Sequence, residues 1–422
     1  MRDEIPVSYT PSAMYPRTNP RSRRPLLFVV VVACLLISAP IFAQDSTPSR
    51  AAAIIDSMPH AKKISEVALS ADGMQVAYIV DDKLTVTSAS GGSPQTIAVE
   101  SNLPLRDVVW SADSKRIAFI ADLPGDVPSA QIWIAAADGS APAKHAELKG
   151  YVQAPRFSPD GSKLAILFIE GMPRVAGPLQ PMTPLAGVID QKIFEQRITT
   201  IDLSTDHLTP VSPADVYVYE YDWTPDSQAW AATAAHGNGD ANWWVARLYL
   251  VNAGSGEMRE IYKPKLQLAD PRVSPDGSNV AFIEGLMSDE GSTGGDIHIV
   301  PTATGAVRNL TPNIKASPFA IAWTAPDQVT FAEDVDGNFG FARVNTKSGA
   351  IQTLWKGEEL AHPAGTAWSA SDASSAITTA IVRQSGSTPP EVWVGPIGKW
   401  KQLTSLNADL KPAWGEMRNV HW

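Results

Sequence analysis

Short apolar segments separated by polar turns recur along the whole chain. Seven times a hydrophobic residue leads into a Ser/Thr-x-Asp turn, and most copies continue into a short apolar stretch. The clearest copies are Ser158-Pro159-Asp160-Gly161 and Ser274-Pro275-Asp276-Gly277. No window near these turns has the i, i+3, i+4, i+7 apolar spacing of a helix, so the pattern predicts β-strands.

The aspartates of these turns lie 41 to 66 residues apart, and the last two copies carry one extra residue, after Trp323 and Trp368. In such a turn Pro presets φ, Asp bonds the local backbone and Gly takes a positive φ without steric cost. We therefore interpret the seven aspartates as turn-forming rather than catalytic. They are Asp72, Asp113, Asp160, Asp226, Asp276, Asp327 and Asp372.

Each repeat then continues through a third strand, such as Leu248–Val251, and a Gly-bearing turn to a fourth strand, such as Ile351–Leu354. Four short strands in each of seven repeats predict an all-β fold, a seven-bladed β-propeller with four antiparallel strands per blade, over residues 58–406. The last blade contains all four of its strands, from about Trp368 to Thr404. We therefore expect side-chain packing to close the ring, without a strand donated by the N-terminus.

The N-terminus has the features of an export signal. Four arginines between residues 17 and 24 precede an apolar run from Leu26 to Ile37, which ends in small residues up to Ala43. This arrangement is typical of a secretory signal, and the run is short for a membrane-spanning helix. We expect residues 1–43 to be a signal peptide cleaved after Ala43 or, alternatively, a membrane anchor within residues 26–43, followed by a linker over 44–57. Lipidation of Cys34 is disfavoured because the apolar segment continues past it.

With this segment the chain would be exported to the periplasm or the extracellular space and touch a membrane only through its N-terminus. Composition narrows the possible chemistry and partners further. Cys34 is the only cysteine, which excludes disulfides, thiol catalysis and cysteine metal sites from a mature chain. Without residues 1–43 the formal charge moves from −10 to −13 and no basic cluster is left, so nucleic acid is a poor candidate partner.

Catalytic motifs are missing from the sequence. It contains no G-x-S-x-G nucleophile turn, no H-E-x-x-H and no glycine-rich phosphate loop, and its seven histidines are scattered singly. We expect no catalytic residue, no cofactor and no metal site in this chain, and we leave open whether it is part of an enzyme.

Two other segments are candidates for function. The long Pro- and Gly-rich stretch from Glu170 to Gln196 separates the second and third strands of blade 3, on the face that carries both ends of the propeller. Residues 217, 219, 221 and 223 are alternating aromatics, expected on one face of a strand, and Trp243 and Trp244 are expected to open the next outer strand. They would pack between blades or form an aromatic wall near the channel. The candidate channel or interface residues are Tyr219, Tyr221, Trp243 and Trp244.

Blades built on S-P-D-G-x-x-[LIV]-A-[FY] resemble those of two groups, TolB-type periplasmic propellers and the propeller of prolyl-oligopeptidase-family serine peptidases. Val218–Asp226 and Gly187–Asp190 are similar to segments of acylaminoacyl- and dipeptidyl-peptidase-like members. Leu403–Asn407, with Trp414–Glu416 and the final His421-Trp422, looks like the junction that leads into their hydrolase domain, so we assign residues 407–422 to such a junction.

In that family the propeller gates access and positions peptide substrates, whereas Ser, Asp and His come from a C-terminal α/β-hydrolase domain. No position of this chain matches those three residues. The resemblance implies a non-catalytic propeller of a serine peptidase, with a peptide or protein ligand and a separately encoded hydrolase domain as partners. The alternative is a stand-alone TolB-like periplasmic propeller that acts as a protein–protein interaction scaffold. In either case we expect no peptidase activity from the chain alone.

Overall fold

Antiparallel strands form nearly all of the regular structure, as the sequence predicts. The computed structural model describes residues 60–99, 103–172, 194–237, 240–287, 293–303, 305–362, 368–370, 377–410 and 420. The predicted signal or anchor, the linker, most of the blade 3 insertion, Asp372 and most of the junction lie outside these residues. None of the helices formed by the described residues is long and apolar enough to span a lipid bilayer.

The described strands form six antiparallel sheets. The first contains β1 (Ile64–Leu69), β2 (Gln75–Val80), β3 (Lys83–Ser88) and β4 (Gln95–Thr96). The second has seven strands: β5 (Leu105–Trp110), β6 (Arg116–Asp122), β7 (Ser129–Ala136), β8 (Ala143–Phe157), β9 (Lys163–Glu170), β10 (Arg197–Asp202) and β11 (Leu208–Pro210). The third contains β12 (Val216–Trp223), β13 (Ala229–His236), β14 (Arg247–Asn252) and β15 (Met258–Tyr262).

The remaining sheets repeat the same order. The fourth contains β16 (Gln267–Val273), β17 (Asn279–Met287), β18 (Thr293–Pro301) and β19 (Arg308–Asn309). The fifth contains β20 (Ser317–Ala325), β21 (Gln328–Val335), β22 (Asn338–Asn345) and β23 (Ile351–Gly357). The sixth contains β24 (Leu360–His362), β25 (Trp368–Ala370), β26 (Ile377–Gln384), β27 (Glu391–Pro396) and β28 (Lys401–Gln402), with β24 and β25 both paired to β26.

The second sheet has seven strands because β8 is continuous. Its residues 143–149 pair with β7 and its residues 150–157 pair with β9. Gly150 lies at the changeover with φ +138°, and a Cβ there would lie 2.0 Å from the carbonyl oxygen of Ile169. Glycine alone fits a backbone approach this close. The chain thus passes from one group of four strands to the next without a break in the ladder.

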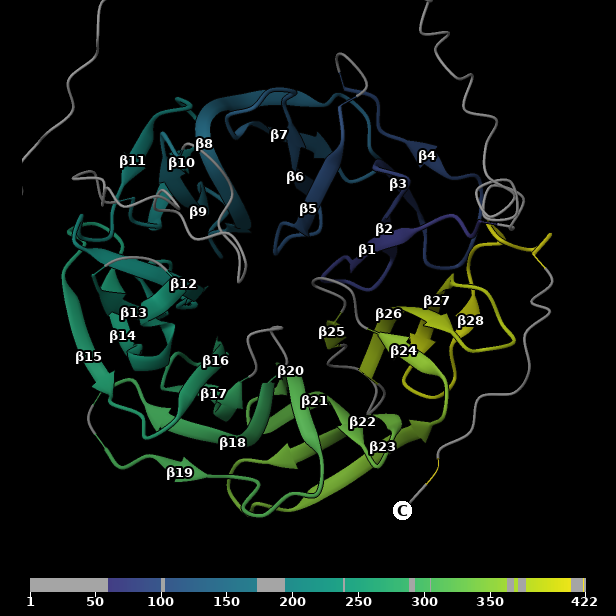
Figure 1. Cartoon of the computed structure of the whole chain (residues 1–422). Coiled ribbons are helices and arrows are strands. Elements are labelled where there is room, and N and C mark those ends of the chain that lie inside the picture. The colour runs from purple at the N-terminus through teal and green to yellow at the C-terminus, as the bar shows by residue number, and fades with distance from the viewer. Residues whose placement is uncertain are drawn as a thin grey trace, which may run out of the picture. The chain divides into compact units, whose positions relative to one another are not determined.

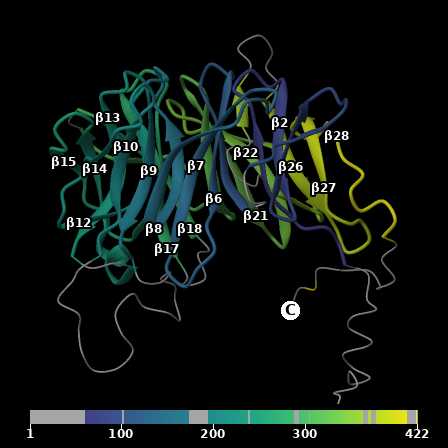
Figure 2. The same ribbon diagram turned by 90° about the horizontal axis from the view of Figure 1, so that it is seen from above.

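Within residues 61–422, which form one compact unit, the sheets are arranged around a central axis (Figure 1). Strands β1, β5, β12, β16 and β20 lie innermost, and β4, β15, β19 and β23 lie outermost. The strands run from one face of the ring to the other (Figure 2). We call the face with the Ser/Thr-x-Asp turns the turn face. The entry face is the opposite one, with the connections between second and third strands and the links between sheets.

The core lies between successive sheets. The second strand of each group is buried on both sides, as in Val76–Ile79 and Ile117–Ala121, so it reads as a continuous apolar run. One cluster joins Ile79 and Leu84 of the first sheet to Ile117 and Phe119 of the second. Each sheet therefore buries both faces only when its two neighbours are present.

The ring closes without strand exchange. Among the described residues, no strand of the first sheet pairs with a strand of the sixth, which confirms the prediction. The two sheets meet through a cluster of apolar side chains from β1, β2, β26 and β27. They are Val67, Leu69, Val76, Tyr78, Ala380, Val382, Val392 and Val394.

One side chain adds hydrogen bonds to this closure. The Asn407 amide oxygen accepts the N–H of Lys62 at 2.7 Å, and the amide nitrogen donates to the Lys62 carbonyl at 3.3 Å. The amide nitrogen also donates to the Pro390 carbonyl at 2.8 Å, and the Asn407 N–H donates to the Glu391 carboxylate at 2.6 Å. A single buried amide therefore supplies the donor and the acceptor that a neighbouring strand would offer to Lys62.

We predict that Asn407→Ala lowers the free energy of unfolding by about 1–3 kcal/mol, because the backbone groups of Lys62 and Pro390 lose their partner in partly buried hydrogen bonds. Asn338→Ala is the control, since its side chain donates one bond within an exposed turn, and its effect should stay within about 0.5 kcal/mol. Denaturant unfolding measures both variants. Equal effects of the two substitutions would show that Asn407 does not hold the closure.

Candidate functional site

The innermost strands contain a β-bulge about four residues before the Ser/Thr-x-Asp turn. The pairing register shifts between Ile64 and Glu66, between Arg106 and Val109, between Val218 and Glu220, and between Ala269 and Arg272. At such a bulge one residue is left outside the ladder, so its N–H needs another acceptor. The positive φ of 53° at Asp107 and 56° at Asp270 belongs to these bulges.

Carboxylates of the preceding innermost strand accept these N–H groups. Glu66 accepts from Asp107 at 2.8 Å and from Val108 at 2.9 Å. Both oxygens of Glu220 accept the N–H of Asp270, at 3.0 and 3.1 Å. Asp270 in turn accepts the N–H of Ile321 at 2.6 Å. We call Glu66, Asp107, Glu220 and Asp270 the carboxylate belt, and each lies four residues before the Ser or Thr of its turn.

The second half of β8 departs from this pattern. Its equivalent residue is Ala154, which also has a positive φ of 53° but carries no carboxylate. The Asp107 carboxylate accepts its N–H, and its carbonyl accepts the Tyr221 hydroxyl at 2.6 Å. Ala154 therefore receives a contact from each neighbour and passes on no side-chain bond of its own.

Tryptophan side chains reach back to the preceding innermost strand, whereas the belt carboxylates reach forward to the next one. The indole N–H groups of the residue before the turn donate to a carbonyl of the preceding innermost strand. The pairs are Trp110 to Ala68 at 3.2 Å, Trp223 to Arg156 at 3.2 Å and Trp323 to Arg272 at 3.0 Å. At the β1–β5 and β16–β20 seams an acid and a tryptophan act together, whereas the other described seams between innermost strands have one of the two.

Burial dominates the electrostatics of the belt. It raises the pKa of Glu220 to about 7, and the nearby charge of Asp270 adds to the effect. Burial also raises the pKa of Asp270, while Arg272, which forms an ion pair with it, lowers it. Asp222 completes this group by accepting the N–H of Val273 at 2.9 Å. The seam between β12 and β16 therefore holds three close carboxylates.

The turn aspartates make local bonds on the turn face. In the first five copies the Ser or Thr hydroxyl donates to the Asp carboxylate at 2.5–2.6 Å. The Ser274 hydroxyl and the N–H of Ser278 lower the pKa of Asp276 to about 2. Asp327 differs, because a register shift between Trp323 and Ala325 accompanies the extra residue, and its carboxylate accepts the Asn345 amide at 3.3 Å. Asp372 lies outside the described residues.

The candidate aromatics fall into two clusters separated by the bulge of β12. Tyr219 stacks on Trp243, with ring centroids 5.4 Å apart and planes 9° apart, next to Tyr217. Tyr221 and Trp223 instead pack against Trp230. Both groups contact the half of the second sheet that precedes β12, through Tyr151 and Phe194 or through bonds to Ala154 and Arg156.

The expected position of Trp243 and Trp244 is wrong. They lie in the 3-10 helix η2 (Asp240–Val245), and the outer strand β14 begins only at Arg247. The Trp243 indole N–H donates to the Leu268 carbonyl at 3.3 Å while its ring stacks on Tyr219, and these contacts turn the segment away from the ladder. Trp244 is left half exposed, at 51%.

Two hollows open on the turn face. The first, about 290 Å³, lies where the ends of β1, β5, β8 and β12 converge, and we call it the central pocket. Trp110, Phe157 and Trp223 line it together with Arg156 and Asp222. It is the place where aromatic and charged side chains of the innermost strands meet.

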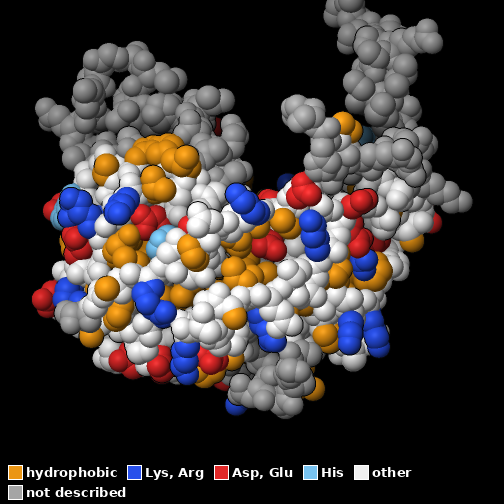
Figure 3. All heavy atoms as spheres, turned by 90° about the horizontal axis from the view of Figure 1, so that it is seen from below, with side chains coloured by type: hydrophobic (Ala, Val, Ile, Leu, Met, Phe, Trp, Pro, Cys, Tyr) orange, Lys and Arg blue, Asp and Glu red, His pale blue; other side chains and the backbone are white. Residues whose placement is uncertain are grey.

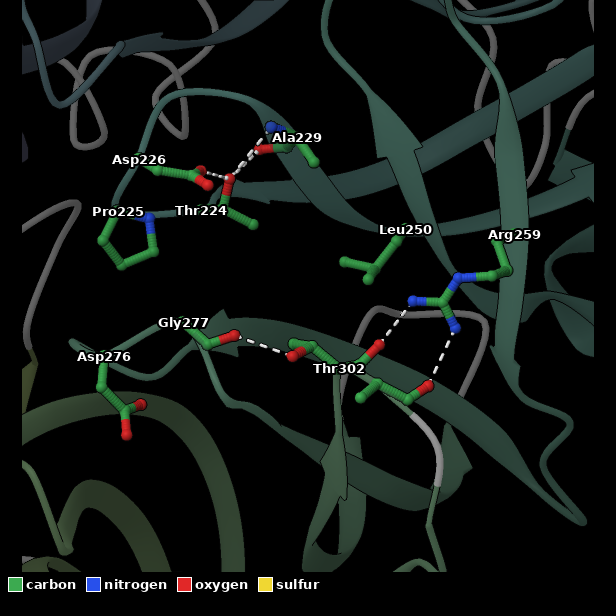
Figure 4. A pocket seen from close by; sticks show the side chains of 10 residues that line it. Thr224, Pro225, Asp226, Ala229, Leu250, Arg259, Asp276, Gly277 and Thr302 are labelled. Carbon is green, nitrogen blue, oxygen red and sulfur yellow. Dashed lines mark hydrogen bonds between the residues drawn. The ribbon is translucent and has the colours of Figure 1, made fainter.

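The second hollow, about 460 Å³, is a groove between the third and fourth sheets (Figure 4). Arg259 reaches across it and donates to the carbonyls of Thr302 and Ala303, at 2.5 and 3.0 Å. The Thr302 hydroxyl donates to the Gly277 carbonyl at 2.8 Å. These groups bond to the backbone of the seam itself, so the groove offers little chemistry. No three acidic, His or Cys side chains of the described residues are placed to hold a metal ion.

Comparison with known proteins shows solved structures with a similar fold and one curated protein of low sequence identity. No family model matches the chain. The uncharacterized peptidase YuxL of Bacillus subtilis is 26% identical over 215 residues, which are 51% of this chain and 26% of that protein. The chain thus spans about a quarter of the length of this curated relative.

Two solved structures agree with the fold. The β-propeller domain of the Trilobed protease from Pyrococcus furiosus, described as having an open velcro topology, has a TM-score of 0.58 at 14% identity, covering 82% of this chain and 99% of that one. Acylaminoacyl peptidase of Pyrococcus horikoshii has a TM-score of 0.57 at 15% identity, covering 82% and 52%. These matches confirm, at the level of fold, the resemblance to propellers of the prolyl-oligopeptidase family.

Titration of Glu220 should be visible in stability. Its pKa is about 7 in the folded chain, above its ordinary value of 4.5. Relative to Glu220→Gln, the wild type should therefore lose on the order of 3 kcal/mol between about pH 4.5 and pH 7.5, because ionisation in that window favours the unfolded chain. Denaturant unfolding over this range measures the difference. Glu257→Gln, at an exposed turn, is the control, and a parallel pH profile for wild type and Glu220→Gln would contradict the prediction.

Proposed function

We propose that this chain is the non-catalytic propeller of an exported serine peptidase of the prolyl-oligopeptidase type, where it gates and positions peptides for a hydrolase domain. That domain would come from a further part of the protein or from a separate chain. The observation that carries the proposal is the match of the described fold, over 82% of the chain, to the propeller domain of a protease and to acylaminoacyl peptidase. The sequence relative YuxL, itself named a peptidase, supports the same class.

We propose seven blades over residues 58–406, with the seven-stranded sheet counted as two. The changeover at Gly150 supports this count, since each half of β8 completes a group of four strands. Residues 143–149 would be the outer, fourth strand of one blade, and residues 150–157 the inner, first strand of the next. We assign the turn aspartates, Asp372 included, to turn formation in these blades, and residues 407–422 to a junction with the hydrolase.

Export rests on the N-terminal sequence. We propose that residues 1–43 direct the chain across a membrane, either as a signal cleaved after Ala43 or as an anchor through residues 26–43. Their basic, apolar and small-residue order supports this role.

The entry face offers a surface for the hydrolase domain. Most of the large exposed hydrophobic side chains of the described residues lie at its loops and strand ends, and hydrophobic side chains gather along a rim of the ring in Figure 3. Four of them form one area. Leu266 and Leu286 extend the pairing of β16 with β17, and the Trp243–Leu268 bond holds η2, with Trp244 and Val245, over the start of β16. Exposed apolar groups of this kind mark protein contacts.

The test is association with the hydrolase. The gene beyond codon 422 and its neighbours should encode a G-x-S-x-G domain, and this domain should bind the chain and cleave dipeptidyl chromogenic substrates, whereas the chain alone should be inert. We predict that Trp244→Ser with Leu286→Ser weakens binding of the domain about tenfold or more, because both exposed anchors are lost.

Met74→Ser with Ile351→Ser is the matched control, since these residues are comparably exposed, at 67% and 46%, but lie on the turn face. Titration calorimetry compares the two variants with the wild type. Cleavage by the purified chain alone would refute the non-catalytic role. If no hydrolase is encoded or none binds, the scaffold alternative replaces the proposal.

A further inference from the structure

We infer that the central pocket binds the C-terminal carboxylate of a peptide whose last side chain is apolar, with Arg156 as the residue that pairs with the carboxylate. This inference deepens the proposed function and rests on it for the peptide as ligand class. It names the end of the peptide that the propeller recognises and places that recognition on the turn face, away from the proposed hydrolase surface.

The first observation is that Arg156 has donors to spare. Among the described residues its guanidinium makes one hydrogen bond, to Asp222 Oδ1, and the distance of 3.4 Å is long. The other oxygen of Asp222 accepts the N–H of Val273, which commits this carboxylate to the seam. A guanidinium has five donors in a planar fork that fits a carboxylate with two parallel bonds.

The carboxylate belt explains why Arg156 has unused donors. Arg272 occupies the position equivalent to Arg156, two residues before the turn, and pairs with the belt carboxylate Asp270 of its own strand. In β8 the belt residue is Ala154, so the matching partner of Arg156 is missing. Arg106, the third arginine of the innermost strands, bonds to two carboxylates and a carbonyl. Arg156 alone of the three has no carboxylate of its own strand: it makes the long contact with Asp222, lies over the Tyr221 ring at 5.7 Å from the centroid, and lines the central pocket.

The aromatic side chains that line the central pocket favour an apolar side chain next to the carboxylate of the peptide. Phe157 and Trp223 line the pocket with 8% and 6% of their surfaces exposed, and Trp110 stands beside them. The indole N–H groups of Trp110 and Trp223 already donate to backbone carbonyls, so these side chains offer only their ring surfaces. An apolar side chain next to a carboxylate matches this combination of surfaces.

The size of the pocket selects the end of a chain. Its volume of about 290 Å³ is at the lower limit of small-molecule sites, so it holds a terminal residue rather than a whole peptide. The chain as a whole is acidic, with a formal charge of −10, so its overall field does not attract anions. Recognition of a carboxylate therefore depends on the local fork of Arg156.

The experiment measures binding of defined peptides to the full-length chain, without any hydrolase, by titration calorimetry. The probes are acetyl-Ala-Ala-Phe with a free carboxylate, the same peptide as its amide, and acetyl-Ala-Ala-Glu amide, which carries a side-chain carboxylate instead. We expect the free acid to bind about tenfold or more tightly than either amide, because only it pairs a charged terminus with an apolar side chain. Arg156→Gln should abolish this preference, and Arg247→Gln, an exposed arginine of β14, should keep it.

A second variant protects the test against misfolding of Arg156→Gln. Ala154→Asp restores the missing belt carboxylate, and Asp tolerates the positive φ there, as Asp107 and Asp270 show. It should retain the fold and lose the preference for the free acid, because the new carboxylate occupies Arg156.

Three outcomes would overturn the inference: equal binding of acid and amide, equal binding of the glutamate amide and the free acid, or no peptide binding at all. Failure here leaves hydrolase association untouched, because that assay uses the opposite face and a different partner.

Discussion

The unpaired N–H groups at the bulges of the innermost strands are the constraint on which the ring depends. A bulge lets each strand curve at the crowded centre but leaves a partly buried donor that needs another acceptor. The belt carboxylates Glu66, Asp107, Glu220 and Asp270 satisfy these donors from the preceding strand. Where the first and sixth sheets meet, a side chain again satisfies backbone groups of the neighbouring sheet, but it is an amide instead of a carboxylate. Lys62 presents both a donor and an acceptor, so an amide, Asn407, serves where a carboxylate would satisfy only half of the contact.

This solution places negative charge where water is scarce. Burial raises the pKa values of Glu66, Asp107, Glu220 and Asp270, so each seam is stabilised by hydrogen bonds and weakened by the cost of an ionised, desolvated group. Arginines offset that cost where they pair with the belt, as Arg106 and Arg272 do. The missing carboxylate at position 154 removes one such pairing. An irregularity in a structural repeat thus leaves Arg156 with a single long ion pair, to Asp222, beside the central pocket.

The sequence predicts the strands well and the contacts between sheets poorly. Turn chemistry and the spacing of apolar segments are local, so the Ser/Thr-x-Asp copies locate the strands that flank each turn, such as β1 and β2 or β16 and β17, without knowledge of their neighbours. The belt could have been found from an acid four residues before four of the turns, since Glu66 and Asp107 are separated like the aspartates that follow them. Its role was hidden because the contact crosses a seam. The two tryptophans of η2 were misplaced for the same reason: Tyr219 and Leu268, remote in sequence, hold Trp243 outside the strand.

The two faces of the ring differ in a way that separates the proposed roles. On the entry face, exposed apolar loops suit a protein partner, whereas the turn face carries polar turns around one aromatic pocket with an arginine. β12, an innermost strand of eight residues, extends between the faces, and a strand rises about 3.3 Å per residue. A peptide held by its last residue on the turn face would therefore need about eight extended residues to reach a hydrolase on the other face. Peptide length, rather than side-chain identity alone, would then decide which substrates are held at both ends.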